Sequence, residues 1–198
     1  MNTIIKTTLL LLAFSLGLSA QEKKVKVLED AYIQGGNTMT TPLGQKKPKD
    51  LLVFNSEAGT KYSRITYLKF KLPKKTKKVN SVELTINIKV YLSKKQNENK
   101  FSLQVYGVEN DNWNESSITW DNAPELGEVL GETEIEQSYD SNTHTVTVKL
   151  DANKFNGLIE RRDKYVTLAL FNNNFNKLSS KLHAKEQGMS KAAYLKIK

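Results

Sequence analysis

The sequence predicts an all-β protein: an antiparallel two-sheet β-sandwich, jelly-roll-like, with at most one short helix. Apolar and polar residues alternate with period two in several segments, which is the pattern of strands with one buried face. Turn-forming residues separate these segments, for example Gly35-Gly36-Asn37 and Pro42-Leu43-Gly44. The helices that a parallel sheet would need between its strands are missing, so we expect a sandwich.

The clearest strand covers residues 82–90, where aliphatic residues alternate with polar ones at every position. Residues 144–150 alternate in the same way. Residues 152–161 carry apolar side chains at helical spacing and form the one short helix that we expect. Further strands are predicted, in chain order, at residues 25–28, 31–34, 51–54, 101–108, 165–171, 181–184 and 193–197.

The strand predicted at residues 64–72 also bears on function. Its alternation turns Leu68, Phe70 and Leu72 toward the core. We expect the opposite face of the strand to be open to solvent. That face carries Ile65, Tyr67, Lys69 and Lys71.

The first twenty residues have the three parts of a secretory signal. Lys6 supplies positive charge, residues 9–18 form an apolar run, and Leu18-Ser19-Ala20 resembles a cleavage site. An uncleaved anchor is the alternative, but ten apolar residues are too few to span a bilayer. We therefore expect a signal peptide at residues 1–20, one exported domain at residues 21–198, and no membrane insertion. The location would be extracellular or periplasmic.

Residues that commonly carry catalysis are scarce. The chain has no cysteine and two histidines, and it lacks a zinc-type histidine spacing, a phosphate-binding glycine loop and a G-x-S-x-G motif. We therefore expect a protein that is not an enzyme and that requires no cofactor. The alternative enzyme is a small polysaccharide lyase, in which Arg64, Tyr67 and Lys69 would supply the base and the neutralising charge.

Positive charge is concentrated in one part of the chain. The net charge is +9, and residues 46–78 hold eleven Lys and Arg against two acids. Residues 109–140, in contrast, hold ten acids and no basic residue. Clustered charge creates a local field, which favours a polyanionic partner. Solvated loop and edge-strand lysines are the alternative interpretation.

An acidic polysaccharide fits the basic segment, because lysine and arginine bind carboxylates by charge-assisted hydrogen bonds. Alternate residues of a strand lie about 6.5–7 Å apart, so a row of cations can follow a repeating anion. Nucleic acid would also suit the charge, but export argues against it. The candidate ligand residues are Tyr32, Gln34, Lys46, Lys47, Lys49, Lys61, Arg64, Tyr67, Lys69 and Lys71.

Three acids near turns are candidate metal ligands. Asp30, Asp111 and Glu186 offer the hard oxygen atoms that calcium prefers. A structural calcium ion is one interpretation of these residues, and solvated acids are the other.

The stretch W-N-E-S-S-I-T-W-D-N-A-P, residues 113–124, is the most specific motif of the sequence. Together with E-D-A-Y-I-Q-G-G at 29–36, R-I-T-Y-L-K-F-K-L at 64–72 and H-A-K-E-Q at 183–187, it resembles the DNRLRE domain family, also described as carbohydrate-binding module family 96. The resemblance covers roughly residues 25–198. The sequence departs from the family pattern after Glu186: family members often have a proline before the last strand, and this chain has Ser190-Lys191-Ala192 there.

The resemblance implies a β-sandwich that binds acidic glycans such as alginate and that acts beside polysaccharide lyases. A structural or adhesive cell-surface protein is a further alternative. Trp113 and Trp120 have two interpretations: their indoles stack on sugar rings, or they pack against the sandwich. We favour packing, because the segment that carries them connects two strands.

Overall fold

The computed structural model describes residues 22–44, 50–57, 59–74, 76–92, 100–137, 143–160, 164–174 and 178–198. The predicted signal peptide lies outside these ranges, as do the predicted ligand residues Lys46, Lys47 and Lys49. No helix in the described ranges is both long enough and apolar enough to cross a membrane.

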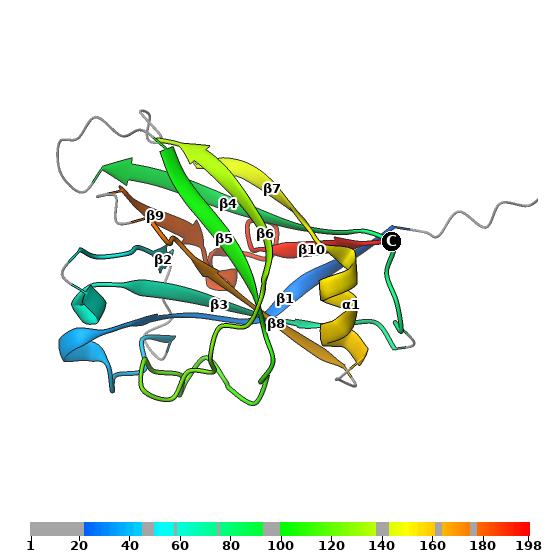
Figure 1. Cartoon of the computed structure of the whole chain (residues 1–198), viewed down its shortest axis with the longest axis horizontal. Coiled ribbons are helices and arrows are strands. Elements are labelled where there is room, and N and C mark those ends of the chain that lie inside the picture. Colours follow the sequence, from blue (N-terminus) through cyan, green and yellow to red (C-terminus); the bar gives the residue numbers. More distant parts are fainter. Residues whose placement is uncertain are drawn as a thin grey trace, which may run out of the picture.

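Within the described ranges, ten antiparallel strands form two packed sheets, so the predicted all-β sandwich is confirmed (Figure 1). Sheet A contains β2 (Asp50–Val53), β9 (Leu178–His183), β4 (Val82–Leu92), β7 (His144–Leu150), β10 (Tyr194–Ile197) and the start of β1 (Lys23–Gln34). Sheet B contains the rest of β1, β3 (Arg64–Lys71), β8 (Tyr165–Phe171), β5 (Lys100–Val108) and β6 (Val129–Glu136).

Strand β1 crosses from one sheet to the other through a β-bulge. Its pairing with β3 shifts register between Val27 and Glu29, and Leu28 projects into solvent. The extra residue exchanges the two faces of the strand. Beyond it, Ala31 packs on the outer face of sheet B, whereas Asp30 faces the interior. The sequence predicted two separate strands here because the bulge interrupts the alternation.

The main core lies between the two sheets, and one end of it is closed by helix α1 (Ala152–Glu160), as predicted (Figure 1). Phe155 and Ile159 of the helix are buried in this core. Asp151 caps the helix, since its Oδ1 accepts hydrogen bonds from the backbone N–H groups of Asn153 (2.8 Å) and Lys154 (3.1 Å).

Strand β6 was not predicted, because four glutamates, a residue type uncommon in strands, occupy residues 128–136. It is the edge strand of sheet B and pairs with β5 along one side. Its acids project outward, and Glu134 forms an ion pair of 3.1 Å with Lys100 of β5. Leu130 and Ile135 supply its contact with the core.

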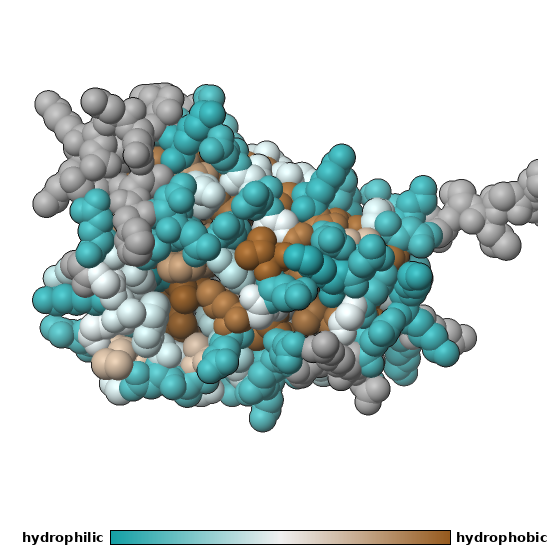
Figure 2. Space-filling view, in the orientation of Figure 1, coloured by the Kyte–Doolittle hydropathy of each residue, from teal (hydrophilic) through white to brown (hydrophobic). Residues whose placement is uncertain are grey.

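The connection between β5 and β6, residues 109–128, covers part of the outer face of sheet B. Trp113 is 8% exposed, and its Nε1 donates a hydrogen bond of 3.0 Å to Thr167 Oγ1 of β8. The Trp113 ring also meets the Tyr67 ring edge-on, with 5.9 Å between the centroids. The structural interpretation of Trp113 is therefore confirmed. Figure 2 shows a group of apolar residues near the crossing of β5, β6 and β8, surrounded by hydrophilic residues.

Candidate functional site

Four of the predicted ligand residues gather at one end of the sandwich. Tyr32 and Gln34 lie at the end of β1, Arg64 begins β3, and Lys61 ends the 3-10 helix η3 (Gly59–Lys61). Arg64 Nε donates a hydrogen bond of 2.7 Å to Gln34 Oε1, and the guanidinium lies 5.8 Å from the centre of the Phe54 ring. This group combines a half-buried arginine with polar neighbours, and its role in ligand binding stays a prediction.

Tyr67 and Lys69 are not on an open surface. Tyr67 is 2% exposed, and its hydroxyl donates a hydrogen bond of 2.7 Å to the carbonyl of Pro124. Lys69 is 6% exposed, pairs with Glu29 at 2.9 Å and donates to the carbonyl of Trp113. The expectation that this face of β3 is open is therefore wrong, because the connection of residues 109–128 packs over it.

Lys71 lies at the opposite end of β3 from Arg64 and is exposed. Its ammonium lies 6.0 Å from the centre of the Tyr165 ring. The predicted ligand residues that the structure describes therefore do not form one surface. They lie at one end of the sandwich, on a covered face and at a separate corner.

A different basic surface covers the outer face of sheet A. The apolar residues of its strands point into the core, so the residues between them point outward. We call this surface the lysine face. It also carries the half-buried rings of Tyr91 and Tyr194, and Glu83 and Asp50 are acids on the same side. Its lysines are Lys24, Lys26, Lys89, Lys149, Lys181 and Lys196.

Two pairs on the lysine face set like charges directly opposite each other. Lys24 faces Lys196 across β1 and β10, and Lys89 faces Lys181 across β4 and β9. Opposed like charges on neighbouring strands are destabilising. The face balances them in part. Glu83 of β4 stands opposite Lys196 on one side and Lys149 on the other. The Lys24 ammonium lies 3.5 Å from the centre of the Tyr194 ring, and the Lys181 ammonium lies 3.4 Å from a carboxylate oxygen of Asp50.

Polar side chains stand between these lysines. Thr145 Oγ1 donates a hydrogen bond of 2.7 Å to Asn87 Oδ1, and Asn87 Nδ2 donates one of 2.8 Å to the carbonyl of Lys191. The hydroxyls of Thr85 and Thr147 lie 3.1 Å apart. The face therefore offers cations, hydroxyl groups and aromatic rings on one surface built by regular strands.

Sums of charge along the chain do not reveal the lysine face, because its residues come from strands that are far apart in the sequence. Residues 79–198 include the acidic stretch 109–140, whose charge offsets the strand lysines in such a sum. In the structure, the described part of that stretch, residues 109–137, belongs to sheet B and its connection. The signal that would have found the face is strand parity, since Lys89 and Lys149 occupy the polar positions of the two clearest predicted strands.

Two hollows of the described surface lie beside the connection of residues 109–128. One, of about 430 Å³, is lined by Glu109, Asn110, Asn122 and Glu125, among others. The second, of about 190 Å³, lies between β5, β6 and α1 and includes Glu109 and Glu128. The first hollow carries two carboxylates and no basic residue, and the second carries two carboxylates against the single cation of Lys154, so neither suits a polyanion.

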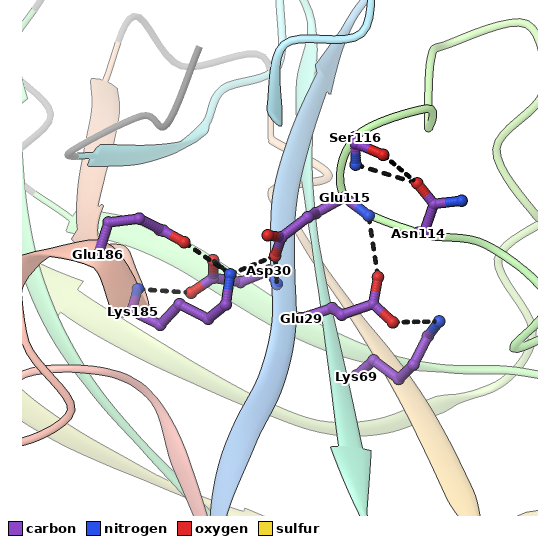
Figure 3. Close-up of polar contacts among 8 residues, drawn as sticks. All are labelled: Glu29, Asp30, Lys69, Asn114, Glu115, Ser116, Lys185 and Glu186. Carbon is purple, nitrogen blue, oxygen red and sulfur yellow. Dashed lines mark hydrogen bonds and ion pairs between the residues drawn. The ribbon is translucent and has the colours of Figure 1, made fainter. Parts of the chain in front are cut away.

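The acids predicted as metal ligands are brought together only in part. Asp30 and Glu186 meet Glu115, and one carboxylate oxygen of each lies within 4.8 Å of the others (Figure 3). Asp111 is not in this group, which corrects the predicted set. Glu115 was missed because its place between two tryptophans gives no sign that the connection returns to β1.

Lys185 stands among these acids. Its ammonium pairs with Glu115, lies 2.6 Å from Glu186 and lies 4.0 Å from Asp30 Oδ1 (Figure 3). Burial raises the pKa of Asp30 to about 7; the backbone hydrogen bond from Lys185 opposes this, and the charge of Glu186 adds to it. Burial lowers the pKa of Lys185, but the hydrogen bonds to Glu115 and Glu186 outweigh it, so the pKa of Lys185 is raised.

The fold and this polar surface agree with a comparison of the whole sequence. The family model of carbohydrate-binding module family 96 matches residues 21–198, so the chain belongs to this family. The protein is thus a carbohydrate-binding module, a class of non-catalytic binding domains. A search of the curated proteins found no match.

Among solved structures, the K1 cleaved adhesin domain of Lys-gingipain from Porphyromonas gingivalis W83 is 13% identical, with a TM-score of 0.38 over 90% of this chain and 98% of that one. The CBM22-1–GH10 modules of the Clostridium thermocellum xylanase 10B, in complex with xylohexaose, are 10% identical, with a TM-score of 0.36 over 88% of this chain and 28% of that one. TM-scores this low carry no argument about this chain.

Proposed function

We propose that this module is exported and binds an anionic polysaccharide through the lysine face, with alginate or a similar polyuronate as ligand. The observation that supports this most is the pairing of like charges, Lys24 with Lys196 and Lys89 with Lys181. A row of anions on this face would relieve the repulsion that each pair creates.

The chemistry of the face suits a polyuronate. Each sugar unit carries one carboxylate, and a lysine ammonium holds a carboxylate by a charge-assisted hydrogen bond. The rings of Tyr91 and Tyr194 offer flat surfaces for the apolar face of a sugar ring. Each exposed charge pair contributes only about 0.2–1 kcal/mol, so affinity comes from several lysines together and falls as salt is added.

The test is affinity electrophoresis and calorimetry of the mature module against alginate, pectate, a sulfated glycan and neutral laminarin. We expect binding to an acidic polymer, weakened at high salt, and none to laminarin. In the double variant Lys89→Gln/Lys181→Gln, binding should fall about two- to thirtyfold, as two contacts of about 0.2–1 kcal/mol each are lost.

The matched control is Lys77→Gln/Lys78→Gln, which removes two exposed lysines from the connection between β3 and β4. This control should bind as the unchanged module does. Equal losses in the two double variants would mean that net charge alone drives binding. A folded module that binds no polymer of the panel would overturn the proposal and favour an adhesive protein that recognises another protein.

We also propose that the module is not an enzyme. In the lyase alternative Tyr67 would be the base, but burial raises the pKa of Tyr67 and its hydroxyl donates to Pro124. Arg64 projects from the other face of β3, because it has the parity of Leu68. We expect no ultraviolet-absorbing unsaturated uronate from alginate incubated with the module, and its appearance would reinstate the lyase. If the module acts beside polysaccharide lyases, it does so by binding the polysaccharide that the lyases cleave.

A further inference from the structure

The carboxylate cluster of Asp30, Glu115 and Glu186 joins three segments that are far apart in the sequence. Asp30 lies on β1, Glu115 lies on the connection of residues 109–128, and Glu186 lies on the 3-10 helix η4 (Lys185–Gln187). Figure 3 shows the three side chains converging on one point beside β1. Three carboxylates face one ammonium there, that of Lys185, so the cluster carries an excess of negative charge.

Lys185 satisfies only one of the two carboxylate oxygens of Asp30. The Asp30 side chain is fully buried, and Oδ2 accepts a hydrogen bond of 2.8 Å from the backbone N–H of Lys185. Oδ1 is buried and has no hydrogen-bond partner, since the Lys185 ammonium at 4.0 Å is too distant. A buried carboxylate oxygen without a partner is costly, and its direction into the cluster marks a place for a second cation.

We propose that the cluster is a binding site for a divalent cation, with calcium as the ion that its chemistry favours. Asp30, Glu115 and Glu186 are the ligands, and Lys185 is the internal cation that holds the site until the metal displaces it. The Lys185 side chain is 18% exposed, so its ammonium has a path to solvent.

Calcium fits better than the other common ions. The ligand atoms are all carboxylate oxygens, which excludes the sulfur and nitrogen sets preferred by zinc and copper. Calcium accepts an irregular set of oxygens completed by water, whereas magnesium demands near-ideal octahedral geometry. Because Lys185 competes, we expect a dissociation constant of about 10⁻⁴–10⁻³ M, the range of extracellular calcium modules.

Metal binding would fasten the connection of residues 109–128 to the sandwich. Glu115 accepts a hydrogen bond from the backbone N–H of Asp30 (3.4 Å), and its own N–H donates to Glu29 Oε2 (3.0 Å). Glu29 also pairs with Lys69, beneath Trp113. A cation bound to Glu115 therefore strengthens the same contact that seats Trp113 on sheet B.

The experiment measures the thermal midpoint and the calorimetric heat of binding of the mature module, first in chelator and then across a calcium titration. At a calcium concentration about ten times the dissociation constant, we expect the midpoint to rise by about 3–6 °C. Magnesium at the same concentration should give a smaller rise, and sodium at matched ionic strength should give none.

Two variants separate a metal site from an ordinary ion-pair network. Lys185→Gln should lower the midpoint in chelator but bind calcium about five- to tenfold more tightly, because the competing internal cation is gone. Asp30→Asn should lose the calcium response, and Asp111→Asn, which removes an acid outside the cluster, should keep it.

If calcium changes the thermal midpoint of neither protein, the unchanged module or Lys185→Gln, the proposed site is wrong. An equal loss of response in Asp30→Asn and Asp111→Asn would also overturn it. If Asp30→Asn fails to fold, Glu186→Gln, at an exposed position, replaces it in the comparison. The assay contains no glycan and none of these variants lies on the lysine face, so its outcome is independent of the proposed function.

Discussion

At the scale of single residues, the module depends on a few buried polar groups. Trp113 is one of them, since its indole N–H meets the hydroxyl of Thr167. Lys69 is another, since its ammonium lies 4.6 Å from the centre of the Trp113 ring and reaches the Trp113 carbonyl. These contacts fix the connection of residues 109–128 on sheet B.

Replacing Trp113 by Phe tests this arrangement. The change removes the N–H donor and leaves the buried Thr167 hydroxyl without that partner. We expect the free energy of unfolding to fall by about 1–3 kcal/mol, measured by chemical denaturation. In the double variant Trp113→Phe/Thr167→Val the loss should be smaller than the sum of the two single losses. Simple additivity would show that the hydrogen bond contributes nothing.

His183 makes the stability of the module depend on pH. Burial and the charge of Lys191 lower the pKa of His183 below 6.5, against the opposing charge of Asp50. A histidine with a lowered pKa stabilises the fold above pH 6.5, and this contribution is lost as the pH falls through the lowered value.

Asp30, whose pKa is raised to about 7, stabilises the fold as the pH falls, so the effect of His183 must be measured as a difference between variants. We expect that below pH 6.5 the thermal midpoint of the unchanged module decreases on acidification relative to that of His183→Asn. His144→Asn, at the exposed start of β7, is the matched control. Superimposable pH profiles of the unchanged module and His183→Asn would contradict this role of His183.

At the scale of strands, the lysine face should reduce the stability of the free protein. Lys89 stands opposite Lys181, and we expect Lys89→Gln to raise the free energy of unfolding by about 0.2–1 kcal/mol in the absence of ligand. The same variant should bind acidic glycan more weakly. Chemical denaturation at low salt measures the first effect, and a loss of stability in Lys89→Gln would contradict it.

Local patterns predicted most strands and the helix, because each depends on neighbouring residues only. Strands β4 and β7 follow strict alternation, and α1 shows helical spacing with a capping aspartate. Strand β6 and the bulge of β1 were not predicted: the first is rich in glutamate, and the second breaks the period of two. The alternation of β3 was also correct, but it could not reveal that a distant connection covers one face.

For the whole molecule, the sheets bring together charges that the chain keeps apart. The lysine face takes residues from β1, β4, β7, β9 and β10, and the carboxylate cluster takes residues from β1, η4 and the connection of residues 109–128. Neither set is close in sequence, so strand parity alone supplies part of the first, and the sequence predicted Asp30 and Glu186 of the second but not Glu115. The family, in contrast, was recognisable from the motif around Trp113 and Trp120, which is local.

The most direct test of the proposed function is a map of amide ¹⁵N–¹H chemical shifts during titration with a short alginate oligosaccharide. We predict that the perturbed amides lie in β4, β9 and β10 and centre on Lys89, Lys181 and Lys196. Shifts that instead centre on Tyr32, Gln34 and Arg64, or on the acidic hollow around Glu109, would contradict the lysine face as the binding surface.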